Sequence, residues 1–273
     1  MNSVRVSLAG LSFDVTPDDG LSEAERQCLG RLERGGEGPV FTLTVTEGPG
    51  VRGQEEGAPA SVDVAEGKLQ VSHADFFAEL DPLGGSGHLR RVHGLAFPLE
   101  ITLRAALCAR LPLTGGLPLH AAGVVVDGRG VAFFGPSGAG KSTLASTSIH
   151  PVLSDELVAL LPGEPMALAA TGFWGTLGDG ATLAGRFSLR AVVELAKGPE
   201  FCWERLPASQ AFRRLAQVVL VPPGAALWTE ALGVLDTVVR QVPVYRMEWS
   251  PTAPPWGEIA RRFAAPEISS RIS

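Results

Sequence analysis

The stretch Leu119–Thr143, LHAAGVVVDGRGVAFFGPSGAGKST, decides the fold of this chain. Two apolar runs flank the dipeptide Asp127-Gly128, which is typical of the two-residue turn of a β-hairpin. The second run leads directly into Gly135–Ser142, which matches the phosphate-binding pattern G-x-x-x-x-G-K-S. The sequence therefore predicts a β-hairpin that feeds a glycine-rich loop, followed by a helix over residues 141–149.

The residue types of this loop suit a triphosphate. Its glycines let the backbone curl so that the N–H groups face inward. Lys141 would place a positive charge on the β- and γ-phosphates, and the Ser142 hydroxyl would ligate Mg²⁺. The alternative is an ordinary glycine-rich turn between a strand and a helix. We expect ATP to contact the whole run of Gly135, Pro136, Ser137, Gly138, Ala139, Gly140, Lys141, Ser142 and Thr143.

An acidic pair follows the expected helix. Asp155 and Glu156 come at the end of a short strand, where phosphoryl-transfer sites hold their metal, so Asp155 joins Ser142 as an expected Mg²⁺ ligand. If the strand geometry continues, the two carboxylates point to opposite sides, and only one of them faces the metal directly. His120, at the start of the hairpin, would either tune a carboxylate of the pair as a base or bond only to backbone.

Composition narrows the class of protein. The 273 residues are 45% hydrophobic and 19% charged, as in an ordinary globular protein. A net charge of −6 argues against a nucleic-acid binder, and there is no apolar run long enough for a membrane span. The three widely spaced cysteines indicate neither a disulfide framework nor a zinc site, so a cytoplasmic location is the simplest interpretation. Against twenty arginines there are only three lysines, and one of them lies in the loop.

Three parts are expected along the chain: a small N-terminal α+β domain over 1–95, the loop-bearing domain over 96–250, and a proline-containing tail over 251–273, partly ordered at best. Residues 81–88, DPLGGSGH, would form a flexible joint, and residues 171–187 contain too many glycines for regular structure. The remaining expected elements are strands at 4–8, 41–46, 151–154, 157–161, 165–169, 191–195, 218–221 and 242–249, two short strands within 61–71, and helices at 22–34, 98–111, 208–217 and 227–240.

Together, Leu119–Val126, the loop and the segment Leu153-Ser-Asp-Glu156 resemble the C-terminal kinase domain of the HPr kinase/phosphorylase family, in particular its stand-alone HPr-kinase-related members. The likeness covers about residues 100–250. It extends more remotely to the nucleotide site of phosphoenolpyruvate carboxykinases, which share this fold. The resemblance implies an α/β P-loop kinase domain in which a mixed sheet carries the hairpin that feeds the loop.

The resemblance also implies roles. Asp155 would be the base toward a serine hydroxyl and would lie near Mg²⁺, with Glu156 and His120 beside it and Lys141 on the phosphates. Thr143 stands where the family usually has Glu, and Glu156 where it usually has Asp. No segment matches the loop with which the family gathers its protein substrate, so HPr itself and the reverse phosphorylase reaction are not implied.

Residues 171–187 would take the place of that loop. Phe173 and Trp174 would offer apolar surface to a substrate, and Arg186 or Arg190 would reach the transferring phosphoryl group. Alternatively, this is a surface loop whose aromatic residues pack on the sheet.

Three hypotheses of function follow. The first is an ATP-dependent kinase acting on a hydroxyl, for which we expect a serine of a protein or peptide. The second is a small-molecule kinase acting on an amino acid or a sugar-like hydroxyl. The third is a nucleotide-binding regulatory protein without activity. Neither nucleic acid nor membrane is expected as a partner, and a homo-oligomer is left open because HPr kinases are hexamers.

Overall fold

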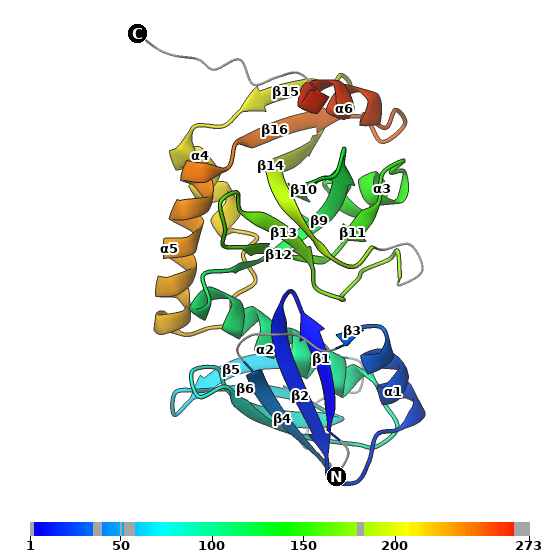
Figure 1. The fold of residues 1–273 in the computed structure, drawn as a ribbon, viewed down its shortest axis with the longest axis vertical. Coiled ribbons are helices and arrows are strands. Elements are labelled where there is room, and N and C mark those ends of the chain that lie inside the picture. The colour runs from blue at the N-terminus through cyan, green and yellow to red at the C-terminus, as the bar shows by residue number, and fades with distance from the viewer. Residues whose placement is uncertain (1–2, 35–39, 50, 52–57, 179–182, 265–273) are drawn as a thin grey trace.

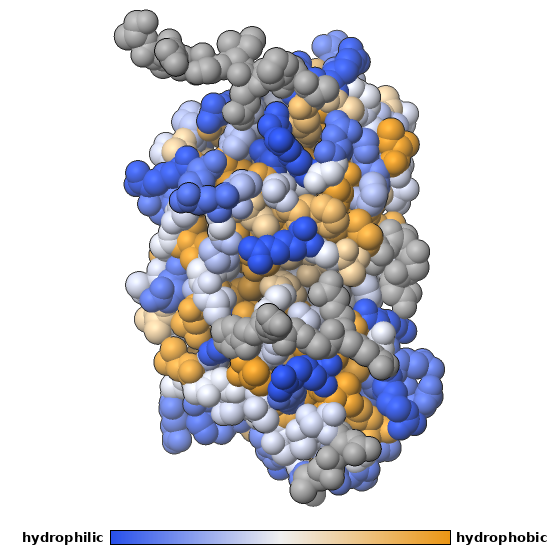
Figure 2. All heavy atoms as spheres, in the orientation of Figure 1, coloured by the Kyte–Doolittle hydropathy of each residue, from blue (hydrophilic) through white to orange (hydrophobic). Residues whose placement is uncertain are grey.

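The computed structural model describes residues 3–34, 40–49, 51, 58–178 and 183–264. Within them the chain is a mixed α/β protein with two mixed sheets, one formed by the N-terminal third and one by the rest (Figure 1). Hydrophilic and hydrophobic residues are intermixed over the face drawn in Figure 2.

The first sheet has eight strands in the order β3-β1-β2-β4-β8-β7-β6-β5, with parallel pairing of β2 with β4 and of β4 with β8. Its helix α1 begins with the predicted capping box, in which Ser22 and Glu25 bond to each other's backbone N–H groups. The elements are β1 Val4–Leu8, β2 Leu11–Pro17, α1 Glu23–Gly30, β3 Glu33–Arg34, β4 Val40–Glu47, β5 Ser61–Ala65, β6 Lys68–His73, β7 Phe76–Asp81 and β8 Ser86–Arg91.

Helix α2 (Phe97–Leu113) lies between the two sheets and contacts strands of both (Figure 1). The second sheet follows, with the predicted hairpin as its first two strands. The elements are β9 Leu117–Val126, β10 Arg129–Phe134, α3 Lys141–Ser146, β11 Val152–Ser154, β12 Leu157–Leu161, β13 Ala167–Ala170, β14 Arg186–Lys197, β15 Cys202–Arg205, α4 Ala208–Ala216, α5 Ala225–Gln241, β16 Val244–Trp249 and α6 Trp256–Ala264.

Five strands of the second sheet form a closed ring, β10-β9-β12-β13-β14, because the long strand β14 pairs with both β13 and β10. The start of β14 is antiparallel to β13, and its later part, through Glu194, is parallel to β10. Strand β9 is buried along almost its whole length, as expected for a strand covered on both faces, and His120 is its one half-buried residue.

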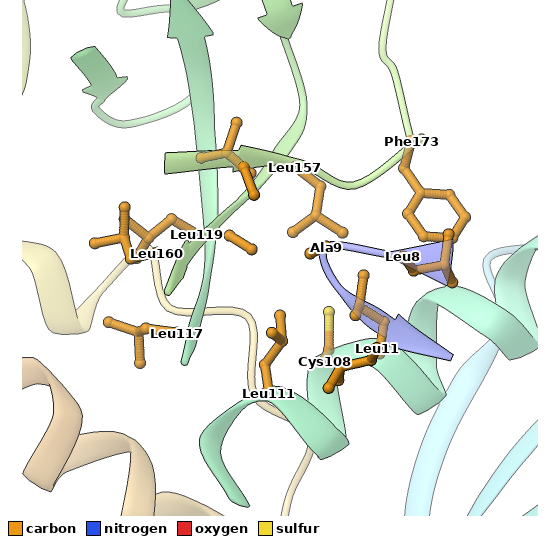
Figure 3. Close-up of a cluster of buried hydrophobic side chains, with 14 of the residues drawn as sticks. Leu8, Ala9, Leu11, Cys108, Leu111, Leu117, Leu119, Leu157, Leu160 and Phe173 are labelled. Carbon is orange, nitrogen blue, oxygen red and sulfur yellow. The ribbon is translucent and has the colours of Figure 1, made fainter. Parts of the chain in front are cut away.

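A continuous apolar core joins the two sheets through α2. The turn between β1 and β2 reaches into it: Leu8, Ala9 and Leu11 pack among Cys108 of α2 and Leu157 of β12 (Figure 3). A second cluster, on the other side of β9 and β10, lies under α3 and α6. The first sheet is therefore packed directly against the sheet that carries the glycine-rich loop.

Some sequence-based expectations were wrong. Residues 81–88 are not a flexible joint: residues 82–85 form the turn between β7 and β8, and the others belong to these two strands. Asp81 accepts the Gly84 N–H at 2.8 Å, and a Cβ on Gly84 would lie 2.3 Å from that carboxylate. Residues 218–221 form only an isolated bridge to β9. The tail, expected to be partly ordered at best, contains helix α6, whose Trp256 packs edge-on against Phe133; residues 265–273 lie outside the described chain.

Candidate functional site

The strand pairing of the second sheet brings three distant sequence segments to one place. Antiparallel pairing of β9 with β10 sets Ala121 opposite Phe134, the last residue before the glycine-rich loop. Strand β12 pairs with the other side of β9 and sets Leu157 opposite His120. The acidic pair directly before Leu157 therefore lies next to His120, beside the end of β10 where the loop begins.

The loop between β10 and α3 has the backbone that its sequence predicts. Gly138 and Gly140 have φ values of 80° and 99°, which L side chains rarely adopt. A Cβ on Gly140 would also lie 2.8 Å from the ring of Trp249, so the loop rests closely on that indole. Among the described residues, the N–H groups of Ser137, Gly138 and Gly140 have no protein acceptor, so they are available to an anion.

Helix α3 spans Lys141–Ser146 and is shorter than the expected 141–149. The helix macrodipole grows from aligned peptide units, so a helix of six residues offers an anion little beyond its own first N–H groups. Attraction of phosphate to this site therefore depends mainly on the loop amides and on the lysine side chain.

Lys141 is almost buried, with 7% of its surface exposed, and its ammonium group donates to the Gly135 carbonyl at 2.9 Å and to the Pro136 carbonyl at 3.4 Å. Burial lowers the pKa of Lys141, and the nearby Glu156 carboxylate opposes this shift. The ammonium group is thus held inside the curl of the loop by bonds that a phosphate oxygen could replace.

Asp155 is buried and held by a second loop. Its Oδ1 accepts the Gly175 N–H at 2.8 Å, and its Oδ2 accepts the N–H and the hydroxyl of Thr176, each at 3.0 Å. Burial by itself would raise the pKa of Asp155, but the hydrogen bonds from Gly175, Ser142 and Thr176 outweigh it and hold the pKa below its usual value. Asp155 is therefore a fixed carboxylate anion beside Ser142.

Glu156 is held by different partners. Its Oε1 accepts a hydrogen bond from Arg104 of α2 at 2.7 Å, and its Oε2 lies 3.5 Å from His120 Nδ1. The same ring nitrogen lies 3.0 Å from the Glu156 backbone carbonyl. Both alternatives for His120 are thus present, since it approaches the carboxylate and bonds to backbone.

These residues line one pocket of about 330 Å³. Its walls are entirely polar, charged or glycine, and they comprise His120, Ser137, Gly138, Gly140, Lys141, Ser142, Thr143, Asp155, Glu156 and Lys197. Both acidic residues line the pocket, and the expectation that their carboxylates point to opposite sides held only for a strand that continues through them. The strand does not continue through them: β11 has a register shift between Val152 and Ser154, as at the bulges that re-aim side chains near many active sites, and residues 155–156 form a bend before β12.

Some site residues were not predicted from the sequence. Gly175 and Thr176 hold Asp155, Arg104 holds Glu156, and Lys197 lines the pocket from the end of β14. The scarcity of lysine in this chain was a signal that could have singled out Lys197. Arg104 carried no such signal, because only the folded chain brings α2 to the acidic pair.

The expected substrate contacts lie elsewhere. Phe173 is 3% exposed and packs in the core beside Leu8, so it offers no apolar surface to a substrate (Figure 3). Trp174 is half-buried next to it. Arg186, at the start of β14, donates to the Pro162 carbonyl. It lies about 25 Å along the strand from Glu194, the residue of β14 that pairs with Phe134 just before the glycine-rich loop. Arg190 donates to the Phe263 carbonyl of α6.

Comparison with known proteins adds little to this geometry. No family model and no curated protein matches the chain. Among solved structures, the Hpr(Ser) kinase/phosphatase from Coxiella burnetii is similar with a TM-score of 0.31 and 12% identity, over 53% of this chain and 93% of that one. A likeness of this size assigns neither fold family nor activity. No helix in the described ranges is long and apolar enough to cross a bilayer.

Proposed function

We propose that this chain is an ATP-dependent kinase that transfers the γ-phosphate to a hydroxyl group, that of a serine in a protein or peptide. The observation that carries the proposal is that the glycine-rich loop, Lys141, both carboxylates and His120 line a single pocket. An all-polar lining with two lysines suits phosphate oxygens. The apolar face of the nucleobase would then lie outside this pocket.

The acidic pair and Ser142 fit a magnesium ion. Hydroxyl and carboxylate oxygens are the protein ligands that Mg²⁺ prefers, usually one or two beside phosphate oxygens and water. The Asp155 carboxylate is held by Gly175 and Thr176 and lies beside the Ser142 hydroxyl, so the two side chains would offer oxygens to the same cation. Mg²⁺ bound by Ser142 and Asp155 would neutralise charge on the β- and γ-phosphates.

In the transfer, the bond between the γ-phosphorus and the bridging oxygen of ATP breaks, and a bond from the acceptor oxygen to that phosphorus forms. ADP leaves with the bridging oxygen. The proton of the acceptor hydroxyl passes to a carboxylate of the pair, for which Asp155 is the proposed base. Lys141 and the loop amides stabilise the charge that moves onto the β-phosphate. Glu156 and His120 line the same pocket and would lie beside the acceptor hydroxyl.

A serine of a protein or peptide is proposed as the acceptor on two grounds. The motifs of this chain resemble those of HPr kinases, which act on a serine. The segment that closes over Asp155 also leaves Gly175 and Thr176 exposed, so a large acceptor has access to this edge of the pocket.

The test uses radiolabelled γ-phosphate. We expect the full chain with Mg-ATP to label one component of a cell extract that is large enough to be retained by a protein-sized filter. Asp155→Asn should cut the transfer rate about 10²- to 10⁴-fold, as loss of a general base does, while binding of ATP in EDTA, which does not use the metal, persists. Asp127→Asn, the same change at the exposed β9–β10 turn, is the matched control and should label as the wild type does.

Lys141→Met separates binding from chemistry. It keeps the side-chain volume and removes a buried charge, but it also leaves the Gly135 carbonyl without its donor, so the melting temperature should change little, whereas the Kd for ATP should rise at least about tenfold. If the label were found instead in a new low-mass product other than ATP and inorganic phosphate, the acceptor would be a small molecule and not a protein. Tight ATP binding without transfer to any fraction would leave a nucleotide-binding regulatory protein, and no binding to wild type would end the proposal.

A further inference from the structure

The segment Thr171–Thr176, here called the clasp loop, connects the acidic pair to the first sheet. At one end, its Gly175 and Thr176 amides hold the Asp155 carboxylate. A Cβ on Gly175 would lie 3.0 Å from Asp155 Oδ2, so the loop and the carboxylate are in tight contact. The position of this carboxylate therefore depends on where the clasp loop lies.

The clasp loop has a second connection to the acidic pair through its backbone. Ser154 donates to the Phe173 carbonyl at 2.8 Å and accepts the N–H groups of Glu156 at 2.9 Å and of Leu157 at 3.1 Å. The Ser154 hydroxyl is completely buried, so water does not compete for these bonds. A displacement of Phe173 would therefore act on the bend that carries both carboxylates.

The other end of the clasp loop rests on the first sheet. The Phe173 ring lies beside Leu8 at the end of β1 (Figure 3). A Cβ on Gly172 would lie 2.5 Å from Leu32 Cδ2 and 3.8 Å from Leu8 Cδ2, so the backbone itself contacts these two side chains. Leu8 and Leu32 are 1% and 7% exposed, which makes this a packed and dry contact.

The β1–β2 turn that presents Leu8 is a tight and specific structure. Ala9 and Gly10 have φ values of 50° and 84°, the two positive values of a type I′ hairpin turn. Alanine rarely adopts a positive φ, and here its side chain is buried among residues of α2 and the second sheet. The core thus holds the turn, and with it Leu8, in one position.

We infer that Leu8 is a positioning residue for the candidate active site: through the clasp loop, the β1–β2 hairpin sets the place of Asp155 and thereby the Mg²⁺-dependent part of nucleotide binding. This rests on the proposed function. The inference gives the first sheet a role in the candidate active site that the second sheet carries.

The experiment compares Leu8→Ala with Leu43→Ala in the full chain. Leu43 is also completely buried in the first sheet, on β4, and it supplies the same loss of atoms away from the clasp loop. Removal of the groups that orient a metal ligand typically costs 10- to 100-fold in affinity. Calorimetry measures the affinity for ATP with Mg²⁺ and in EDTA. In Leu8→Ala, we expect the gain in affinity that Mg²⁺ provides to fall at least about tenfold, while the affinity in EDTA stays unchanged. In Leu43→Ala, we expect the affinities under both conditions to stay as in wild type.

A second measurement needs no nucleotide. Hydrogen exchange of the Gly175 and Thr176 amides should accelerate in Leu8→Ala and not in Leu43→Ala, because only the first variant releases the clasp loop. Leu8→Met, which conserves volume, should restore the slow exchange. If Leu8→Ala does not fold, Phe173→Leu removes a smaller part of the same contact and takes its place in both measurements.

Equal exchange rates and equal Mg²⁺ dependence in the two alanine variants would overturn the inference. Wild type that binds no ATP would overturn the proposed function instead. In that case the exchange measurement still decides whether the hairpin holds the clasp loop.

Discussion

At the scale of single residues, the three lysines of this chain are informative because each has a different environment. Lys68 forms an exposed ion pair with Glu79 at 2.7 Å. Lys141 is buried in the glycine-rich loop. Lys197 is exposed and lines the same pocket, and within the described residues its ammonium group has no partner. A free cation at the edge of a phosphate pocket is suited to bind an anionic ligand.

Lys197→Met should therefore weaken ATP binding. A charge-assisted bond to phosphate contributes about 1.5–3 kcal/mol, so the Kd should rise about tenfold or more, and less so at high salt. Lys68→Met removes the other exposed lysine and is the control for net charge. Calorimetric titration of both variants with Mg-ATP measures the difference, and an unchanged Kd in Lys197→Met would remove this residue from the binding site.

The environment of a single residue could be predicted from the sequence only where it depends on residues that are near in the chain. The positive φ values of Gly138 and Gly140 agree with the curled loop expected around Lys141 and Ser142, because that signal lies within one short segment. The burial of Phe173 could not be predicted in this way, because it depends on contact with Leu8, which is far away in the sequence. Arg186 could not be placed either, since the length and direction of β14 became evident only from its pairing with β13 and β10.

At the scale of elements, the interruption between β11 and β12 is the feature that builds the candidate site. Both strands pair with β9, but β11 has a register shift between Val152 and Ser154, and the two acidic residues form a bend rather than a continuous strand. Ser154 stabilises the break by bonding to three backbone groups of its surroundings. Alternation along a strand could not predict this, because the alternation rule holds only while the ladder continues.

Ser154→Ala should destabilise the protein. The change leaves buried N–H groups and a carbonyl without their partner, which costs about 1–3 kcal/mol of unfolding free energy. Chemical denaturation measures this, with Ser146→Ala as control, because the Ser146 hydroxyl is exposed and bonds only within α3. A loss no larger in Ser154→Ala than in Ser146→Ala would contradict the role given to this hydroxyl.

Element types were predicted better than element ends. The hairpin β9–β10 and the helices α2, α4 and α5 lie where their patterns indicated. The glycines of residues 81–88 were misread as a joint, since glycine serves equally in a tight turn, and here Asp81 closes one. Helix α6 was not predicted because the prolines just before it suggested irregular structure, whereas its buried Trp256 and Ile259 pack on the second sheet.

At the scale of the whole molecule, a buried ion cluster ties the first sheet to its helix. Arg91 of β8 is completely buried and bonds to Glu25 of α1 at 2.6 Å and to Asp19 at 2.7 Å. Burial by itself would raise the pKa of Asp19, but the hydrogen bonds from Arg91 outweigh it and lower the pKa. The cluster therefore makes folding stability depend on pH.

The sign of this dependence follows from the lowered pKa. Asp19 contributes stability above its unfolded pKa of about 3.9, and the contribution is lost as the pH falls through the lower folded value. Asp19→Asn should therefore be less stable than wild type near neutral pH, and the difference should shrink below about pH 4. Urea denaturation at a series of pH values checks this, and a difference that grows in acid would contradict it.

The packing of the whole chain also predicts the reactivity of its thiols. Burial raises the pKa of Cys28 to about 11 and that of Cys108 to about 12, whereas Cys202 is exposed on β15. A colorimetric thiol reagent at pH 8 should modify one cysteine quickly and all three only in denaturant. Cys202→Ser should abolish the fast reaction, and a second fast thiol in the native protein would contradict this packing.

The five-stranded ring has a consequence for the chain during its synthesis. Until β14 has emerged from the ribosome, β10 and β13 each present an unpaired edge, and such edges are templates for aggregation. A nascent chain interrupted before Arg186 would expose both edges beside an unsupported glycine-rich loop. Folding of the second sheet is thus completed only after β14 has been synthesised. Products truncated before β14 would therefore be targets for chaperones and proteases.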